Sequence, residues 1–215
     1  MHVVDLLRLA VTGLLIWLLR PHLAVIWRFA LPRRVRHKVE ASKAPAGIWN
    51  EIMGQLGFVH LGRREERIPG LERRGYQVFY HDDGVYADLP EAALDAPGPR
   101  APGPRRPPAG LYLTSVLPET LFLITKRVGT EMTRGLYVSQ KTGGPIADML
   151  RVHRATLLRL GLGQRLETPG SLARRAEIFD LWHRDHARAE LRNFAALSVV
   201  LTLIVGGFLV RVWMV

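Results

Sequence analysis

The sequence contains no cysteine, and only four of its 30 basic residues are lysine. Without cysteine the chain forms no disulfide, no thiolate metal site and no cysteine nucleophile. The HExxH, Gly-x-Ser-x-Gly, Walker and GxGxxG patterns are also absent, so no motif indicates a zinc peptidase, a serine hydrolase or a nucleotide site. Strand-like and helix-like segments do not alternate, which argues against a parallel doubly wound sheet.

A long run without charge lies at the C-terminal end. Residues 194–210 read FAALSVVLTLIVGGFLV and contain no ionisable side chain. At about 1.5 Å per residue, a helix over 194–215 covers roughly the 30 Å of a bilayer's hydrocarbon core. Arg211 and Trp213 near its end suit the membrane interface. The pattern predicts a transmembrane helix over 194–215.

Residues 1–32 form a second apolar segment, with a different charge pattern. It is interrupted by Asp5, Arg8, Arg20 and Arg28. The longest uncharged run, Leu9–Leu19, is short for a membrane span. A cleaved signal peptide is disfavoured because no small-x-small site follows the apolar residues. Two interpretations remain: a transmembrane helix kinked at Pro21, which we favour, or an interfacial helix anchored by Trp17 and Trp27.

The basic residues predict how the chain is oriented in the membrane. The net charge is +11, and a basic linker over residues 33–45 contains Arg33, Arg34, Arg36, Lys38 and Lys43. A second basic cluster precedes residue 194. By the positive-inside rule, residues 33–193 are cytoplasmic in an integral protein of a bacterial inner membrane. We expect the five linker cations to contact anionic lipid headgroups, and no nucleic acid partner, because no nucleic-acid module is recognisable.

Residues 46–193 are expected to form a cytoplasmic α+β domain. Apolar periodicity predicts helices over 46–56, over 145–160 and from 172 onward, the last one continuing into the membrane without a hinge. Strand-like runs lie at 58–61, 76–80, 85–89, 111–116, 120–126 and 136–140, with an Asp-Gly hairpin turn at 83–84. Residues 90–110 read as a Pro/Gly-rich loop. The expected fold is an antiparallel sheet of four to six strands with helices on one face, flanked by the two membrane helices.

A few polar groups are candidates for chemistry. Glu177, Asp180, His183 and His186 follow one another at helical i, i+3 spacing. Carboxylate-x-x-His sequences bind metals in four-helix sites only with matching ligands on further helices, which this chain lacks. We therefore expect no metal and no cofactor. Gly143 and Gly144 precede a helix start, a position that can bind an anion. His81-Asp82-Asp83 is more typical of an exposed turn.

Small residues repeat every four positions in the C-terminal segment, at Ser198, Thr202 and Gly206. Such a stripe lets a second helix approach closely in a membrane. It predicts packing of this helix with a second copy or with another membrane protein.

These features favour a membrane-anchored, cytoplasm-facing domain that is not catalytic: a scaffold, a sensor or an accessory subunit of a membrane assembly. The alternative is a membrane-bound enzyme acting on a lipid-linked or small anionic substrate, with His153, Asp180, His183 and His186 as its functional side chains. The two classes differ in one structural respect. An enzyme should bring several of these side chains together in a concave pocket.

Overall fold

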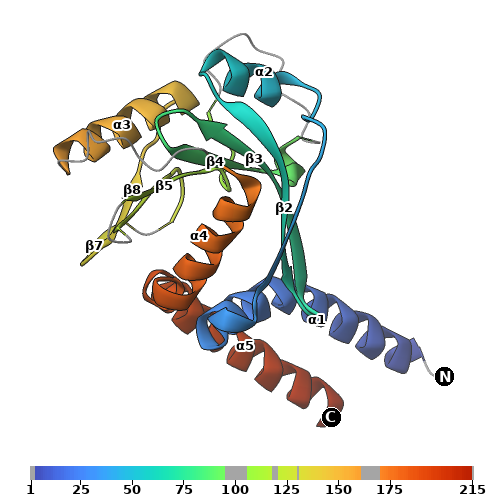
Figure 1. Ribbon diagram of the computed structural model, residues 1–215. Coiled ribbons are helices and arrows are strands. Elements are labelled where there is room, and N and C mark those ends of the chain that lie inside the picture. Colours follow the sequence, from blue (N-terminus) through green and yellow to red (C-terminus); the bar gives the residue numbers. More distant parts are fainter. Residues whose placement is uncertain (1–2, 95–105, 118–120, 130, 161–169, 215) are drawn as a thin grey trace. The chain divides into compact units, whose positions relative to one another are not determined.

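The computed structural model describes residues 3–94, 106–117, 121–129, 131–160 and 170–214. Within them the fold is α+β, with long apolar helices near both ends and an eight-stranded mixed sheet (Figure 1). Most of the predicted Pro/Gly-rich loop, residues 95–105, lies outside the described residues.

The helices are α1 (Val3–Ala30), α2 (Ile48–Gln55), α3 (Ile146–Arg159), α4 (Leu172–Asp185) and α5 (Ala187–Met214), with two short 3-10 helices, η1 (Pro32–Arg34) and η2 (Glu91–Ala93). The strands are β1 (Arg36–Glu40), β2 (Val59–Ile68), β3 (Glu72–His81), β4 (Val85–Pro90), β5 (Tyr112–Leu117), β6 (Leu121–Lys126), β7 (Met132–Arg134) and β8 (Tyr137–Lys141). Their order in the sheet is β1-β2-β3-β4-β5-β6-β8-β7.

The sheet corrects two predictions, because it has eight strands rather than four to six and is not wholly antiparallel. β3–β4–β5–β6 pair antiparallel, whereas β8 pairs parallel with β6. The two strands that the sequence did not predict, β1 and β7, lie at the sheet edges. Each is short, and β1 lies within the predicted basic linker. Edge strands are often short and charged, so they lack the alternating apolar pattern that marks a strand.

One face of the sheet packs against α2 and α3 and forms the main apolar core. Because side chains alternate along a strand, Val85, Ala87 and Leu89 of β4 point to this face. Met53 of α2 and Met149 of α3 join them. The helix predicted over 145–160 is thereby confirmed as α3, with its apolar stripe turned to the sheet.

The opposite face of the sheet is covered by the first part of α4. Tyr86 and Asp88 point to this face, where Arg175 and Phe179 of α4 contact the sheet residues. The prediction that the helices pack on one face was therefore wrong (Figure 1). Coverage of both faces also explains why the whole of Tyr76–Tyr80 is buried, where alternation with exposed residues would mark a half-buried strand.

The local start and turn signals that the sequence predicted are present. Ser171 caps α4, since its Oγ accepts a hydrogen bond from the backbone N–H of Arg174 at 3.1 Å. Gly84 closes the β3–β4 hairpin with a φ of 78°, in the left-handed region that glycine tolerates. The final helix differs from the prediction: it is divided at His186 into α4 and α5, although backbone hydrogen bonds continue across the junction.

The chain divides into two compact units. We call Met1–Arg36, Arg67–Arg73 and Leu181–Val215 the helical unit, and His37–Glu66 with Arg74–Asp180 the sheet unit. The helical unit contains α1, α5 and the turn between β2 and β3. The sheet unit contains the apolar core and the polar clusters described below.

Candidate functional site

In the helical unit, α1 and α5 pack against each other as an antiparallel pair. Arg188 near the start of α5 donates hydrogen bonds to the carbonyls of Phe29 and Ala30 at the end of α1, at 3.2 and 3.1 Å. Farther along, Trp213 Nε1 donates to Thr12 Oγ1 at 3.0 Å. As residue numbers rise along α5, the partners on α1 fall. Arg188 also places a cation at the negative end of the α1 dipole.

The outer surfaces of this helix pair are apolar and exposed. In each helix, only 11% of the most apolar 18-residue window is buried. Both helices are long and apolar enough to cross a membrane. Large apolar side chains that are about half or more exposed occur along each, for example Leu7, Trp17, Leu203 and Ile204. Exposed apolar surface of this extent on a pair of helices is typical of contact with lipid.

The small-residue stripe of α5 has two different environments. Ser198 is only 4% exposed, and its Oγ lies 3.3 Å from His22 Nδ1 of α1. Thr202 Oγ1 donates to the carbonyl of Ser198 within the same helix. A side chain at Gly206, by contrast, would meet no other atom within 4 Å. The stripe thus begins against α1 and ends at open surface.

The turn between β2 and β3 packs on the C-terminal half of α1. Ile68 and Leu71 of the turn join Ala24 and Trp27 of α1 in a small apolar cluster. Beside it, the buried Arg28 forms an ion pair with Glu72 at 2.7 Å. A protein segment that carries charge therefore covers the last two turns of α1, whereas the Val3–Leu18 part has many exposed apolar side chains.

The predicted headgroup contacts lie on the surface. Arg33 and Arg34 of η1, Arg36 of β1 and Lys43 are exposed. Lys38 is also exposed, but its Nζ pairs with Glu40 at 2.9 Å. All five cations therefore have the exposure that contact with an anionic surface requires, and one of them, Lys38, shares its charge with a carboxylate.

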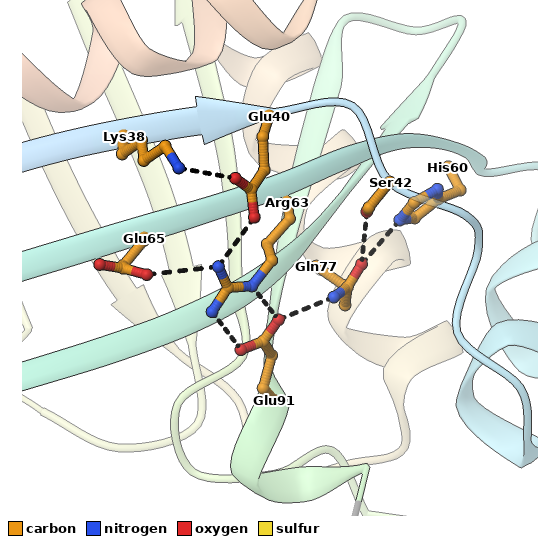
Figure 2. Close-up of polar contacts among 8 residues, drawn as sticks. All are labelled: Lys38, Glu40, Ser42, His60, Arg63, Glu65, Gln77 and Glu91. Carbon is orange, nitrogen blue, oxygen red and sulfur yellow. Dashed lines mark hydrogen bonds and ion pairs between the residues drawn. The ribbon is translucent and has the colours of Figure 1, made fainter.

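In the sheet unit, a cluster of charged and polar side chains surrounds Arg63 (Figure 2). Its guanidinium donates to Glu91 twice, from Nε at 2.6 Å and from Nη2 at 3.0 Å, and Nη1 reaches Glu40 at 3.0 Å and Glu65 at 3.3 Å. Gln77 donates to the same Glu91 at 2.9 Å. The hydrogen bonds to these carboxylates, the one to Glu91 most of all, raise the pKa of Arg63 above its ordinary value. The cluster links β1, β2, β3 and η2, which indicates a structural role.

A second cluster is buried on the opposite face of the sheet, between two arginines and one aspartate. Asp88 accepts hydrogen bonds from Arg64 Nη2 at 2.8 Å and from Arg175 at 2.9 and 2.8 Å, and all three side chains are 2% exposed or less. The Phe179 ring lies 3.7 Å from the Arg64 guanidinium. Burial acts to raise the pKa of Asp88, but Arg175 and Arg64 together hold it below its ordinary value. Asp88 is therefore ionised at neutral pH.

His153 lies inside the apolar core rather than in a pocket. It is 0% exposed, with Nε2 3.0 Å from Ser115 Oγ and Nδ1 2.7 Å from Thr125 Oγ1. Gln140 donates to the same threonine oxygen at 2.7 Å. Burial, aided by the nearby Arg154 charge, lowers the pKa of His153 to about 3. The His153 side chain is thus a neutral, hydrogen-bonded group of the core. In the sequence, only its position on the apolar face of the predicted helix indicated that it would be buried.

The other candidate catalytic side chains have varied surroundings. Asp180 Oδ1 lies 3.5 Å from His37 Nε2, and partial burial raises the pKa of Asp180. His183 is 3% exposed and its ring packs edge-on against Trp182. His186 lies at the junction of α4 and α5. Among the described residues, no group of three or more histidine or acidic side chains is placed to hold a metal ion.

Two further candidate sites from the sequence, the glycines before α3 and the His81–Asp83 turn, each lie beside a charged side chain of α3. At the start of α3, a side chain at Gly144 would lie 2.8 Å from Asp148 Oδ2, so a carboxylate already lies beside the expected anion site. At the β3–β4 turn, Arg154 pairs with Asp83 and donates to His81 Nε2 at 2.9 Å. These contacts attach the hairpin turn to α3.

The comparisons with known proteins give no relative: no family model, no curated protein and no solved structure matches this chain.

Proposed function

We propose that the protein is anchored in a membrane by α1 and α5, and that the domain of residues 33–193 faces the cytoplasm and acts without catalysis. It would serve as a scaffold, a sensor or an accessory subunit of a membrane assembly. The observation that carries the proposal is the antiparallel α1–α5 pair with its exposed apolar surface.

The contacts along this pair support a transmembrane rather than an interfacial α1. His22 of α1 contacts Ser198 of α5, and Thr12 of α1 contacts Trp213 of α5. The two contacts are about 15 Å apart along α1 and about 22 Å apart along α5. A helix lying in the interface runs nearly perpendicular to a spanning helix and could not follow it over that length. If α5 spans the bilayer, α1 therefore runs along it over at least about 15 Å, roughly half the thickness of the hydrocarbon core.

The surroundings of His153 and Asp180 favour the non-catalytic hypothesis over the enzyme alternative. His153 is enclosed by the core, and its ring nitrogens are used by Ser115 and Thr125. Asp180 Oδ1 lies 3.5 Å from His37 Nε2, and the Asp180 side chain is 66% exposed. The enzyme hypothesis needs several of His153, Asp180, His183 and His186 to converge in an accessible pocket, and the enclosed position of His153 gives it no support.

The absence of cysteine makes a topology experiment straightforward. We expect the full-length protein to stay in the membrane pellet after alkaline carbonate extraction. In intact spheroplasts, a membrane-impermeant maleimide applied from outside should label Met214→Cys but not Asp82→Cys, which the proposal places on the cytoplasmic side at an exposed hairpin turn. After permeabilisation both should react. Extraction into the supernatant, or labelling of Asp82→Cys from outside, would contradict the proposal.

Association through α5 is tested by two neighbouring glycines. Gly206→Leu should weaken association of the full-length protein in a membrane dimerisation assay by about tenfold, because it removes a point of close helix approach. Gly207→Leu is the matched control beside the stripe. A Cβ at either position would meet no atom of another part of this chain within 4 Å, so both positions face open space and we expect the α1–α5 pair to stay intact in both variants. Equal association of Gly206→Leu and the parent would exclude the stripe as an interface.

A further inference from the structure

An open groove lies on the helical unit where the β2–β3 turn meets α1. It is lined by Trp17, Leu18, Arg20, Pro21, Leu71 and Glu72. Four of these six side chains are apolar or aromatic. All six residues belong to the same compact unit, so the groove is formed by α1 and the turn that packs on it.

One end of the groove is apolar and the other end is charged, which is the order of polarity met on leaving the hydrocarbon of a membrane for its headgroups. At the end of the groove nearer the α1 N-terminus, Trp17 is 63% exposed and Leu18 is 48% exposed. Arg20 follows them, also exposed, and the segment that covers α1 beyond it contains the exposed Arg67 and Arg73. A tryptophan followed by arginine is typical of the level at which a helix leaves the hydrocarbon.

The charges of the groove favour an anion. Its one carboxylate, Glu72, is paired with Arg28 at 2.7 Å. Among the described residues, Arg20 donates a single hydrogen bond, from Nη2 to the Leu71 carbonyl at 3.1 Å. A guanidinium has five N–H donors in a planar fork, so this bond leaves donors for a phosphate group.

A proline next to this cation leaves one backbone carbonyl of α1 without its usual helical donor. Pro21 lies inside α1 and has no N–H, so it cannot donate the helical hydrogen bond to the carbonyl of Trp17, four residues earlier. Both residues line the groove. An occupant that carries a hydroxyl or ammonium donor close to its phosphate would complement this carbonyl and the Arg20 guanidinium together.

We propose that the groove binds an anionic phospholipid of the leaflet on the domain's side. Its phosphate lies at Arg20, its headgroup hydroxyl lies at the Trp17 carbonyl, and an acyl chain follows Trp17 and Leu18. Phosphatidylglycerol has this combination of groups. The proposal rests on membrane anchoring by α1 and α5, and it assigns a specific lipid site in addition to the diffuse attraction of Arg33, Arg34 and Arg36.

The test uses the full-length protein in a mild detergent, with bound lipid counted by native mass spectrometry. The protein is titrated with phosphatidylglycerol and with phosphatidylcholine of the same acyl chains. We expect phosphatidylglycerol to be retained preferentially, and Arg20→Gln to weaken its binding by about tenfold, as for one lost charge-assisted contact. Arg8→Gln removes the same charge from the same helix outside the groove, and it should have no effect. Trp17→Ala should weaken the binding of both lipids.

Each other outcome overturns the lipid site. Equal retention of the two lipids by the parent protein would show that the groove does not select an anionic headgroup. Equal losses in Arg20→Gln and Arg8→Gln would show diffuse attraction without a site. Membrane anchoring is tested separately by carbonate extraction of the same variants. A protein that stays in the pellet but binds no phosphatidylglycerol refutes the groove alone, whereas release into the supernatant refutes the proposed function as well.

Discussion

Asp88→Ala is expected to lower the free energy of unfolding by about 3–5 kcal/mol, because it leaves two buried guanidinium groups without their carboxylate. Arg64 and Arg175 both donate to this side chain, and none of the three is more than 2% exposed. Urea unfolding of the full-length protein in detergent, followed by near-UV circular dichroism, measures the change. The same cluster holds α4 on the sheet, so the variant should also expose the Leu172–Asp180 segment to proteolysis.

Two controls separate this effect from a general loss of charge. Asp148→Ala removes a carboxylate that pairs with Arg151 on the exposed surface of α3, and it should cost less than about 1 kcal/mol. The triple variant Arg64→Met, Asp88→Leu, Arg175→Met replaces the whole ionic cluster with apolar side chains and should recover most of the lost stability. If Asp88→Ala lowers the free energy of unfolding no more than Asp148→Ala does, the buried cluster does not stabilise the packing of α4 on the sheet.

His153 is expected to make the sheet unit sensitive to acid. In the unfolded chain a histidine binds its proton near pH 6.5, whereas burial lowers the pKa of folded His153 to about 3. Between these values the unfolded state holds the extra proton, so stability falls as the pH is lowered from about 6.5 toward 3. The limiting loss is roughly 5 kcal/mol, from the size of the shift. Above pH 6.5 this contribution should be constant.

Replacement of the imidazole by an amide tests the assignment. His153→Gln cannot titrate, and its amide can still offer a donor and an acceptor to Ser115 and Thr125. Unfolding measured in urea at several pH values should show a flatter profile between pH 6.5 and 3 for His153→Gln than for the parent. His60→Gln, at the partly exposed cluster around Arg63, is the matched control. The depressed pKa of Asp88 acts in the same direction in both proteins, so only the difference between them reports on His153. Parallel profiles would contradict a neutral buried imidazole.

The elements that could be predicted from sequence were those with a strong local pattern. The charge-free run at 194–210 specifies an apolar helix without reference to the rest of the chain, and α3 has apolar residues at helical spacing. The β3–β4 hairpin has aromatic and β-branched runs around Asp-Gly. The edge strands β1 and β7 were missed because pairing with a neighbouring strand, rather than their own composition, makes them strands.

The two polar clusters were missed because their partners are far apart in the chain. Arg175 belongs to the basic cluster that precedes residue 194 and from which the orientation in the membrane was predicted, yet it is buried against Asp88, 87 residues earlier. Neighbouring arginines in β2 point to opposite faces, so Arg63 joins Glu91 on one face and Arg64 joins Asp88 on the other. A charged residue usually marks the surface, and its burial can be recognised only when the fold supplies the opposite charge.

The antiparallel helix pair has a consequence for folding. Because α1 ends beside the start of α5, the roughly 150 residues between them form a loop, and if both helices are anchored in a membrane as proposed, the ends of this loop stay together even when the domain unfolds. A tethered loop has fewer conformations than a chain with free ends, and this restricts the unfolded ensemble much as a covalent cross-link between its ends would. In a protein without cysteine, the proposed membrane anchoring would thus provide the conformational restraint that a disulfide supplies in other small domains.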